Sequence, residues 1–181
     1  MTAAASVRLA DYTPWAFNLP DIALDVNIQG DHVVVTSRLN LEPCRSGEPL
    51  QLCGVDLEIE SLAINQMPLS SEDYSFVDGL LSITNVPTQP FVLETCCRLD
   101  PYSNSSLEGL YASGGLLSTQ CEAEGFRRIS LHPDRPDVLS RWQVRIEASR
   151  SSCPVLLSNG NAIQEESVGA DRHAVTWDDP F

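Results

Sequence analysis

The sequence lacks several features that would place the chain in a specialised class. None of its segments approaches the roughly 18 consecutive apolar residues that a membrane-spanning helix needs. Basic residues are scarce, since 11 Lys and Arg stand against 25 Asp and Glu, which gives a formal net charge of −14. Nucleic acids and anionic membranes attract clustered Lys and Arg, so we expect neither as a partner. An acidic surface serves solubility in most proteins, and it also attracts cations, a protonated amine among them.

The amino-terminal residues show no targeting signal. The first twenty residues, which contain Arg8 and Pro14, have no apolar stretch of the kind that a secretory signal uses, so we expect a cytoplasmic protein. The six cysteines have no CxxC spacing, and two of them, Cys96 and Cys97, are adjacent. In a chain of this size we therefore expect free thiols, mostly buried as small hydrophobic side chains.

No self-contained catalytic or metal-binding motif is present. The three histidines, His32, His132 and His173, are too far apart for the HExxH spacing of a metallohydrolase helix. No nucleophile elbow, Walker loop or dinucleotide fingerprint occurs. A nucleophilic pair of Cys121 and His132 is conceivable, but only their nearness in the sequence supports it. We expect neither a catalytic residue nor a metal ligand in this chain.

Apolar and polar residues alternate with a period of two through much of the chain, and helical periodicity is nearly absent. Residues 22–28 and 33–41 show this alternation on either side of Gly30–Asp31, which predicts a hairpin. Asp78–Gly79 lies between two apolar arms and predicts a tighter hairpin with a two-residue turn. These signals favour antiparallel sheets with one buried face.

Shorter segments predict the rest of the fold. The alternation breaks near Ser61, where a bulge would reset the register. Further strands are expected at residues 91–97, 144–148, 155–157 and 175–177. Only residues 136–141 suggest a helical turn, with a proline at an early position. The spacing of the turns is typical of a sandwich or barrel, so we expect one all-β, mainly antiparallel domain over residues 1–181.

The segment 103–129 interrupts this pattern with Ser, Gly and several acidic residues, and long segments of this kind are more often functional than structureless. Gln120 and Glu122 are two residues apart, so on an extended strand their side chains would leave the same face. A neutral amide beside a carboxylate suits an ammonium group. The alternative is that Glu122 is solvated or pairs with Arg127 or Arg128.

The order of several motifs points to a known family. The segment from Thr119 to Ile129, with Asp134 and Pro136 after it, resembles the TQxEAxxxR…DxP block of the aminopeptidase N family of zinc aminopeptidases, particularly its bacterial branch. Five blocks fit that branch in order, at residues 106–111, 120–126, 134–139, 156–161 and 177–181. The resemblance implies a saddle-like, mainly antiparallel β-sandwich domain with a long loop region, at the amino terminus of a longer enzyme.

The resemblance also implies a function that this chain shares with a missing part. In the family, the following domain carries GxMEN, HExxH and a distal glutamate that binds zinc, and none of these occurs here. By the matching positions, Glu122 binds the free amino terminus of a peptide substrate and Gln120 lines the same S1 region. The implied cofactor is zinc in the full-length enzyme, with none bound by this fragment, which alone would be inactive. The implied partners are peptides with a free amino terminus and the catalytic domain of the same chain.

Some residues of the matching blocks receive no role from the resemblance, and a second hypothesis stays open. Glu108, Tyr111, Cys121 and Asp134 are the residues without an assigned role. Composition and periodicity alone favour a free-standing β-sandwich module that binds carbohydrate or protein, because they show only an antiparallel β domain. A reading frame that continues beyond Phe181 into the zinc motifs would distinguish the two hypotheses.

Overall fold

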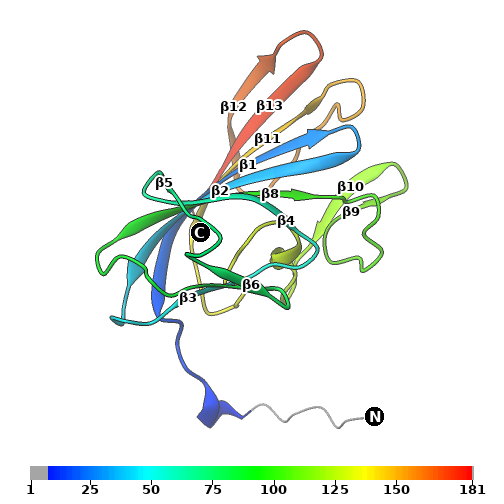
Figure 1. Cartoon of the computed structure of the whole chain (residues 1–181). Coiled ribbons are helices and arrows are strands. Elements are labelled where there is room, and N and C mark those ends of the chain that lie inside the picture. Colours follow the sequence, from blue (N-terminus) through cyan, green and yellow to red (C-terminus); the bar gives the residue numbers. More distant parts are fainter. Residues whose placement is uncertain (1–7, 181) are drawn as a thin grey trace.

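The computed structural model describes residues 8–180, which form two facing β-sheets and a separate two-stranded hairpin (Figure 1). Residues 1–7 and Phe181, the last residue of the fifth motif block, lie outside the described residues. The strands are, in chain order, β1 (Phe17–Gln29), β2 (His32–Pro43), β3 (Leu50–Cys53), β4 (Glu58–Ile64), β5 (Met67–Pro68), β6 (Ser75–Val77), β7 (Leu80–Ile83), β8 (Phe91–Leu99), β9 (Gly109–Ser113), β10 (Leu116–Gln120), β11 (Arg141–Ser149), β12 (Asn161–Val168) and β13 (Arg172–Asp179). Two short 3-10 helices accompany them, η1 (Leu9–Asp11) and η2 (Phe126–Arg128).

The larger sheet contains eight strands in the order β12-β13-β11-β1-β2-β8-β4-β5. All neighbouring strands in it are antiparallel except β1 and β11, which run parallel. The smaller sheet has the order β3-β7-β6, and it lies below the larger one in Figure 1. The prediction of an all-β, mainly antiparallel sandwich is therefore confirmed.

The two predicted hairpins both form. In the first, Gln29 pairs with His32 across the turn at Gly30 and Asp31. In the second, Val77 pairs with Leu80, and the two turn residues between them, Asp78 and Gly79, have φ values of 50° and 77°. Positive φ at both positions is the requirement of a type I′ turn, which Asp-Gly satisfies. The predicted bulge also forms, between Ile59 and Ser61.

The core lies between the two sheets and explains the alternation. The inward residues of β2, which are Val33, Val35, Ser37, Leu39 and Leu41, are each at most 1% exposed. The four aliphatic ones lie in one contiguous hydrophobic cluster with buried leucines of the smaller sheet, such as Leu52 and Leu81. Each such aliphatic side chain contributes about 1.5–3 kcal/mol of burial free energy, so a slip of one residue in β2 would expose several of them at once.

One prediction about secondary structure is wrong, and a second is met only by a single turn. Residues 155–157 form no strand, because only Leu156 packs inward while Val155 and Leu157 stay exposed and Pro154 cannot donate to a ladder. Residues 136–141 form no helix but only one hydrogen-bonded turn, in which the N–H of Val138 donates to the carbonyl of Arg135 at 3.2 Å, before the chain enters β11 at Arg141. The edge strand β12 was not predicted, because most of its side chains are exposed and the sequence alternation is lost.

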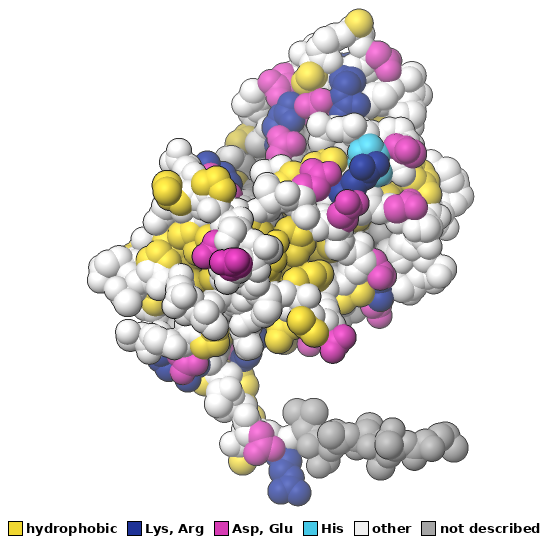
Figure 2. Space-filling model, in the orientation of Figure 1, with side chains coloured by type: hydrophobic (Ala, Val, Ile, Leu, Met, Phe, Trp, Pro, Cys, Tyr) yellow, Lys and Arg dark blue, Asp and Glu magenta, His cyan; other side chains and the backbone are white. Residues whose placement is uncertain are grey.

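An ion-pair network holds the parallel junction of β1 and β11. Arg145 on β11 lies directly opposite Asp25 on β1 and donates to its carboxylate at 2.9 Å. The same guanidinium reaches Glu147 and Glu166 at 2.8 and 2.9 Å. An exposed ion pair contributes little to folding stability on its own, whereas an arginine shared by several carboxylates forms a network that contributes more. Figure 2 shows charged side chains of both signs over β11–β13, whereas hydrophobic ones gather in the centre, between β5 and β6.

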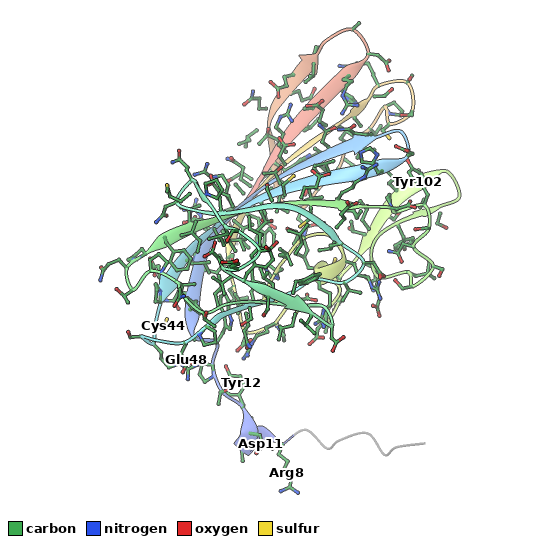
Figure 3. All side chains as sticks on the ribbon, viewed as in Figure 1. Arg8, Asp11, Tyr12, Cys44, Glu48 and Tyr102 are labelled. Atoms are coloured by element: carbon green, nitrogen blue, oxygen red, sulfur yellow. The ribbon has the colours of Figure 1, made fainter. Side chains whose placement is uncertain are left out.

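All six cysteines are unpaired, as predicted from their spacing. The prediction that most are buried is wrong, because only Cys97 is fully buried and Cys44 is exposed. Cys44 lies in the turn after β2, close to the amino-terminal segment that carries Tyr12 (Figure 3). Its backbone N–H donates to the carbonyl of Ala16 at 2.9 Å, so the backbone of this turn is tied down while the thiol faces solvent.

Candidate functional site

The segment that carries Gln120 and Glu122 begins at the end of a hairpin. Gln120 is the last residue of β10 and pairs with Gly109, the first residue of β9. Because β9 begins at Gly109, it has no residue that could pair with the residues after Gln120. Glu122 therefore lies in a bend outside the strand, and the prediction that both residues share one extended strand is wrong. Both side chains are exposed to solvent.

A buried carboxylate organises the chain just after this bend. Asp134, whose side chain is 5% exposed, accepts the backbone N–H of Gly125 at 3.1 and 3.3 Å, that of Phe126 at 3.2 Å and that of Arg127 at 3.3 Å. The Nε of Arg127 completes the set as an ion pair with the same carboxylate. Burial alone would raise the pKa of Asp134, but the hydrogen bonds from Arg127 and Gly125 outweigh it and lower the pKa below its usual value.

The two arginines of η2 are both engaged by acidic residues. Arg127 donates from Nη2 to Glu124 at 2.5 Å in addition to its pair with Asp134. Arg128 pairs with Asp56, and it also reaches Glu108 at 3.4 Å. Neither arginine pairs with Glu122, and within residues 8–180 that side chain has no hydrogen bond or ion pair.

A glycine brings the Asp134-bound backbone against the bend. A Cβ atom on Gly125 would lie 2.8 Å from the carbonyl oxygen of Gln120 and 3.1 Å from the Cα of Cys121. The φ of Gly125 is +149°, which residues with side chains rarely adopt. Only glycine fits at this position, so residues 120–121 and 125 are in direct backbone contact.

The buried ring of His132 accepts a hydrogen bond from the backbone of Asp134. Its ring packs against Phe126 and Trp142 at centroid distances of 5.0 and 5.5 Å, and the residue is 6% exposed. The backbone N–H of Asp134 donates to Nδ1 of His132 at 2.9 Å, so the neutral ring carries its proton on Nε2. Burial lowers the pKa of His132 to about 4, although the charge of Asp134 opposes this shift.

We expect this histidine to make the stability of the chain depend on pH between about 6.5 and 4. The pKa is about 4 in the folded chain and 6.5 in the unfolded chain, so the unfolded state binds one more proton between these values. The folded chain is therefore most stable, with respect to this histidine, above pH 6.5. As the pH falls below that value, the folding equilibrium constant decreases by up to about tenfold per pH unit. Urea unfolding at pH 7, 5.5 and 4 measures this loss.

A His132→Asn variant serves as the control for that measurement. The Asn side chain can place an oxygen near the position of Nδ1 but does not titrate in this range. Its unfolding free energy should be lower at pH 7 and should fall less steeply than that of the original chain between pH 6.5 and 5, because the carboxyl groups titrate mainly below this range. A slope as steep as that of the original chain would show that other groups cause the pH dependence.

The conceivable nucleophilic pair of Cys121 and His132 does not form. Burial, with a smaller contribution from Asp134, raises the pKa of Cys121 to about 11, so the thiol stays protonated at neutral pH. The nucleophile in cysteine catalysis is the thiolate, which a neighbouring base or cation must favour. Nδ1 of His132 is occupied by the backbone of Asp134. This arrangement gives no activated nucleophile.

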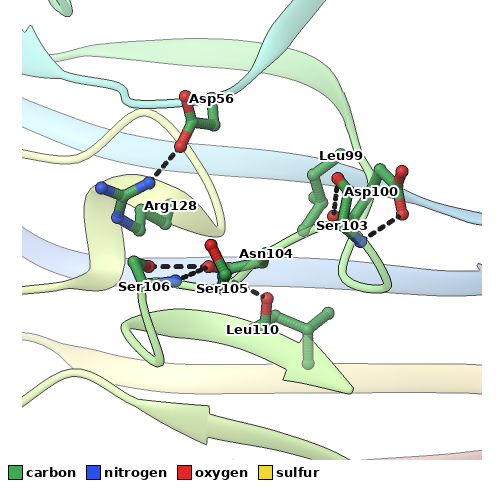
Figure 4. Close-up of a pocket in the computed structure, with 9 residues that line it drawn as sticks. All are labelled: Asp56, Leu99, Asp100, Ser103, Asn104, Ser105, Ser106, Leu110 and Arg128. Atoms are coloured by element: carbon green, nitrogen blue, oxygen red, sulfur yellow. Dashed lines mark hydrogen bonds and ion pairs between the residues drawn. The ribbon is translucent and has the colours of Figure 1, made fainter.

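A separate hollow of about 400 Å³ lies between η2 and the loop after β8 (Figure 4). Several of its polar groups are held by hydrogen bonds or ion pairs. Arg128 contacts Asp56, and the amide nitrogen of Asn104 donates to the carbonyls of Glu108 and Leu110 at 2.8 and 2.9 Å. The hollow includes neither Gln120 nor Glu122, and its contacts fix the loop that precedes β9.

Within residues 8–180 no group of three or more His, Cys, Asp or Glu side chains is arranged to hold a metal ion. In the same residues, no helix is both long and apolar enough to cross a membrane.

Comparisons with known proteins agree on one family. Residues 21–181 match the family model described as Peptidase M1 N-terminal domain. Aminopeptidase N of Caulobacter vibrioides is 45% identical over 179 residues, which are 97% of this chain and 20% of that protein. Aminopeptidase N of Escherichia coli is 40% identical over 172 residues, with coverage of 94% and 19%. The chain thus spans about a fifth of the length of these relatives.

Solved structures give the same result. The structure of Legionella pneumophila aminopeptidase A in complex with aspartic acid superposes with a TM-score of 0.88 at 31% identity, over 96% of this chain and 21% of that one. An M1 zinc metallopeptidase from Deinococcus radiodurans shares the fold, with a TM-score of 0.75 at 12% identity, over 90% of this chain and 39% of that one. The resemblance drawn from the five motif blocks is confirmed.

Proposed function

The chain belongs to the Peptidase M1 N-terminal domain family, and we propose that residues 1–181 are the amino-terminal β domain of a zinc aminopeptidase. The longer enzyme would remove amino-terminal residues from peptides. This domain would contribute the segment that recognises the free amino terminus, with Glu122 as the carboxylate that binds the ammonium group and Gln120 beside it.

The observation that supports this assignment is the difference between Glu122 and the acidic residues around it. Glu124 and Asp134 are both paired with Arg127, whereas Glu122 is exposed and has no partner in residues 8–180. A carboxylate without a partner retains its full attraction for an incoming cation. The wider negative charge of the chain acts in the same direction.

The chemistry of a peptide amino terminus fits this carboxylate. A peptide α-amine has a pKa of about 8, so much of it is cationic at neutral pH. At about 4 Å and an effective dielectric constant near 20, one carboxylate attracts it by about 4 kcal/mol before desolvation. The contact would also fix the register of the peptide, because the scissile bond then lies one residue from the amine.

Zinc chemistry would come from another part of the longer protein. The described residues do not fit a zinc ion, since they contain no cluster of side chains arranged to hold a metal. In this proposal the role of the chain would be to bind and orient the substrate, and the domain that follows would be its partner. We also propose a cytoplasmic location, which the six unpaired thiols support.

Hydrolysis assays on the full-length protein that contains this chain test the proposed function. We expect cleavage of an aminoacyl p-nitroanilide with a free amine, loss of that activity with a zinc chelator, and recovery when zinc is added back. The amino-acetylated substrate should be cleaved poorly. The 181-residue chain alone should be inactive, and its unfolding temperature should not change with the chelator. Equal cleavage of free and acetylated substrates would contradict the proposal, as would full activity in the chelator.

A further inference from the structure

The buried carboxylate of Asp134 carries more donors than any exposed acid near it, and all of them come from the residues just after Glu122. We propose that Asp134 is a positioning residue that fixes Glu122 for binding of the substrate ammonium group, an inference that rests on the proposed function. Asp134 would act through the backbone N–H groups of residues 125–127 and the side chain of Arg127, since its own side chain is buried against them.

The position of Asp134 is itself fixed by the sandwich. His132 and Cys53 of β3 form a bridge, with backbone hydrogen bonds of 2.8 and 3.1 Å in the two directions. The backbone N–H of Asp134 is held by the ring of His132 at 2.9 Å. The carboxylate therefore extends from a segment attached to the smaller sheet, and it can act as a fixed anchor for a loop.

Contacts from this anchor reach both sides of Glu122. On the carboxyl side, Arg127 joins the carboxylate of Asp134 to that of Glu124, so the bend is held two residues after Glu122. On the amino side, Gly125, whose N–H is bound by Asp134, lies in backbone contact with Gln120 and Cys121. The exposed bend thus has fixed points on either side, and Glu122 is the acidic side chain in it that stays free.

The same arrangement keeps a competing cation away from Glu122. Arg127 is five residues from Glu122 in the chain and would be a natural partner for it. In the structure, its Nε is paired with Asp134 and its Nη2 with Glu124. A neutral side chain at position 134 would free the guanidinium to turn toward Glu122, and a paired Glu122 would attract a substrate ammonium more weakly.

An Asp134→Asn variant of the full-length enzyme tests the proposal. Asn keeps the size of the side chain, but it loses the charge and one of the acceptor oxygens. We expect kcat/KM for a free aminoacyl substrate to fall by about 10- to 100-fold, because displacement of a binding group by about 1 Å has effects of this size. The preference for that substrate over its des-amino analogue should fall by a similar factor, with zinc content unchanged.

Two further variants separate positioning from a general structural effect. Asp137→Asn removes another Asp–Arg pair, with Arg135, that makes no contact with residues 120–127, and it should change kcat/KM by less than about twofold. The double variant Glu122→Gln with Asp134→Asn should lose no more activity than the Glu122→Gln variant, because both changes act on one contact. A structural defect would instead multiply with the effect of Glu122→Gln and would affect the des-amino substrate equally.

The outcomes distinguish this inference from the proposed function. If Glu122→Gln lowers the preference for the free amine and Asp134→Asn does not, the positioning role of Asp134 is wrong and the proposed function stands. If Glu122→Gln has no effect, both are wrong. Should Asp134→Asn fail to fold, Arg127→Lys keeps the charge but cannot reach Asp134 and Glu124 together, and we expect a loss of about 3- to 30-fold with the same change in preference. An unchanged preference in that variant would overturn the proposal.

Discussion

Replacement of Glu122 by Gln in the full-length enzyme should lower kcat/KM for substrates with a free amino terminus by about 30- to 1000-fold. Gln keeps the size and hydrogen-bonding capacity of the side chain but removes its charge. Loss of a charge-assisted contact in a partly closed site costs roughly 2–4 kcal/mol, which corresponds to this range. Steady-state kinetics on free, acetylated and des-amino substrates measure the effect.

The blocked substrates and a matched variant make this result specific. Acetylated and des-amino substrates carry no ammonium group, so their slow cleavage should barely change in the Glu122→Gln variant. Glu165, an exposed glutamate on the edge strand β12, offers a matched control, and Glu165→Gln should behave like the original enzyme. Zinc content and unfolding temperature should also be unchanged. A Glu122→Gln enzyme with nearly original kcat/KM would mean that Glu122 is only a solvated carboxylate.

Replacement of Asp134 by Ala should cost the 181-residue chain about 3–5 kcal/mol of unfolding free energy. The change removes a buried carboxylate, which leaves three backbone N–H groups and the Nε of Arg127 without their acceptor. For a domain of this size, 1 kcal/mol shifts the unfolding temperature by about 2–4 °C, so we expect a decrease of roughly 6–20 °C. Thermal and urea unfolding at pH 7 measure it.

The pH dependence identifies the carboxylate as the cause. Because the pKa of Asp134 is lowered in the folded chain, its stabilisation is complete well above 3.8 and is lost as the pH falls through the folded value. The difference between the original chain and Asp134→Ala should therefore shrink below about pH 3.5. Asp137→Ala, which removes a more exposed pair with Arg135, should cost about 1 kcal/mol or less. Equal losses for the two variants would contradict the anchoring role of Asp134.

The hairpins at Gly30–Asp31 and Asp78–Gly79 could be predicted from the sequence because their signals act over a few residues, whereas the hairpin of β9 and β10 within residues 103–129 was not predicted. The alternation in residues 22–28 and 33–41 needs only the pleat of a strand, and Asp78–Gly79 needs only the backbone freedom of two turn residues. The edge strand β12 gives no such signal, since hydrogen bonds to β13 on one side hold it and its side chains bury little. Residues 155–157 are apolar and so suggest a strand, but they form none, because Pro154 cannot donate a ladder hydrogen bond and the residues on both sides of Leu156 are exposed.

The candidate site was predicted only in part. The resemblance supplied Gln120 and Glu122, and the expectation of a shared strand was wrong because β9 provides no partner beyond Gly109. The role of Asp134 depends on three backbone N–H groups that the tertiary fold brings to it from residues 125–127. Sequence spacing does not encode such a contact, although the DxP part of the motif block marked the residue.

The most direct test of the central claim is a crystal structure of the full-length enzyme with an amino acid or short peptide bound. We expect a carboxylate oxygen of Glu122 within about 2.7–3.2 Å of the α-ammonium nitrogen, with Gln120 lining the same pocket and Arg127 still paired with Asp134. An ammonium nitrogen held by other residues, with Glu122 more than about 4 Å away, would contradict the claim.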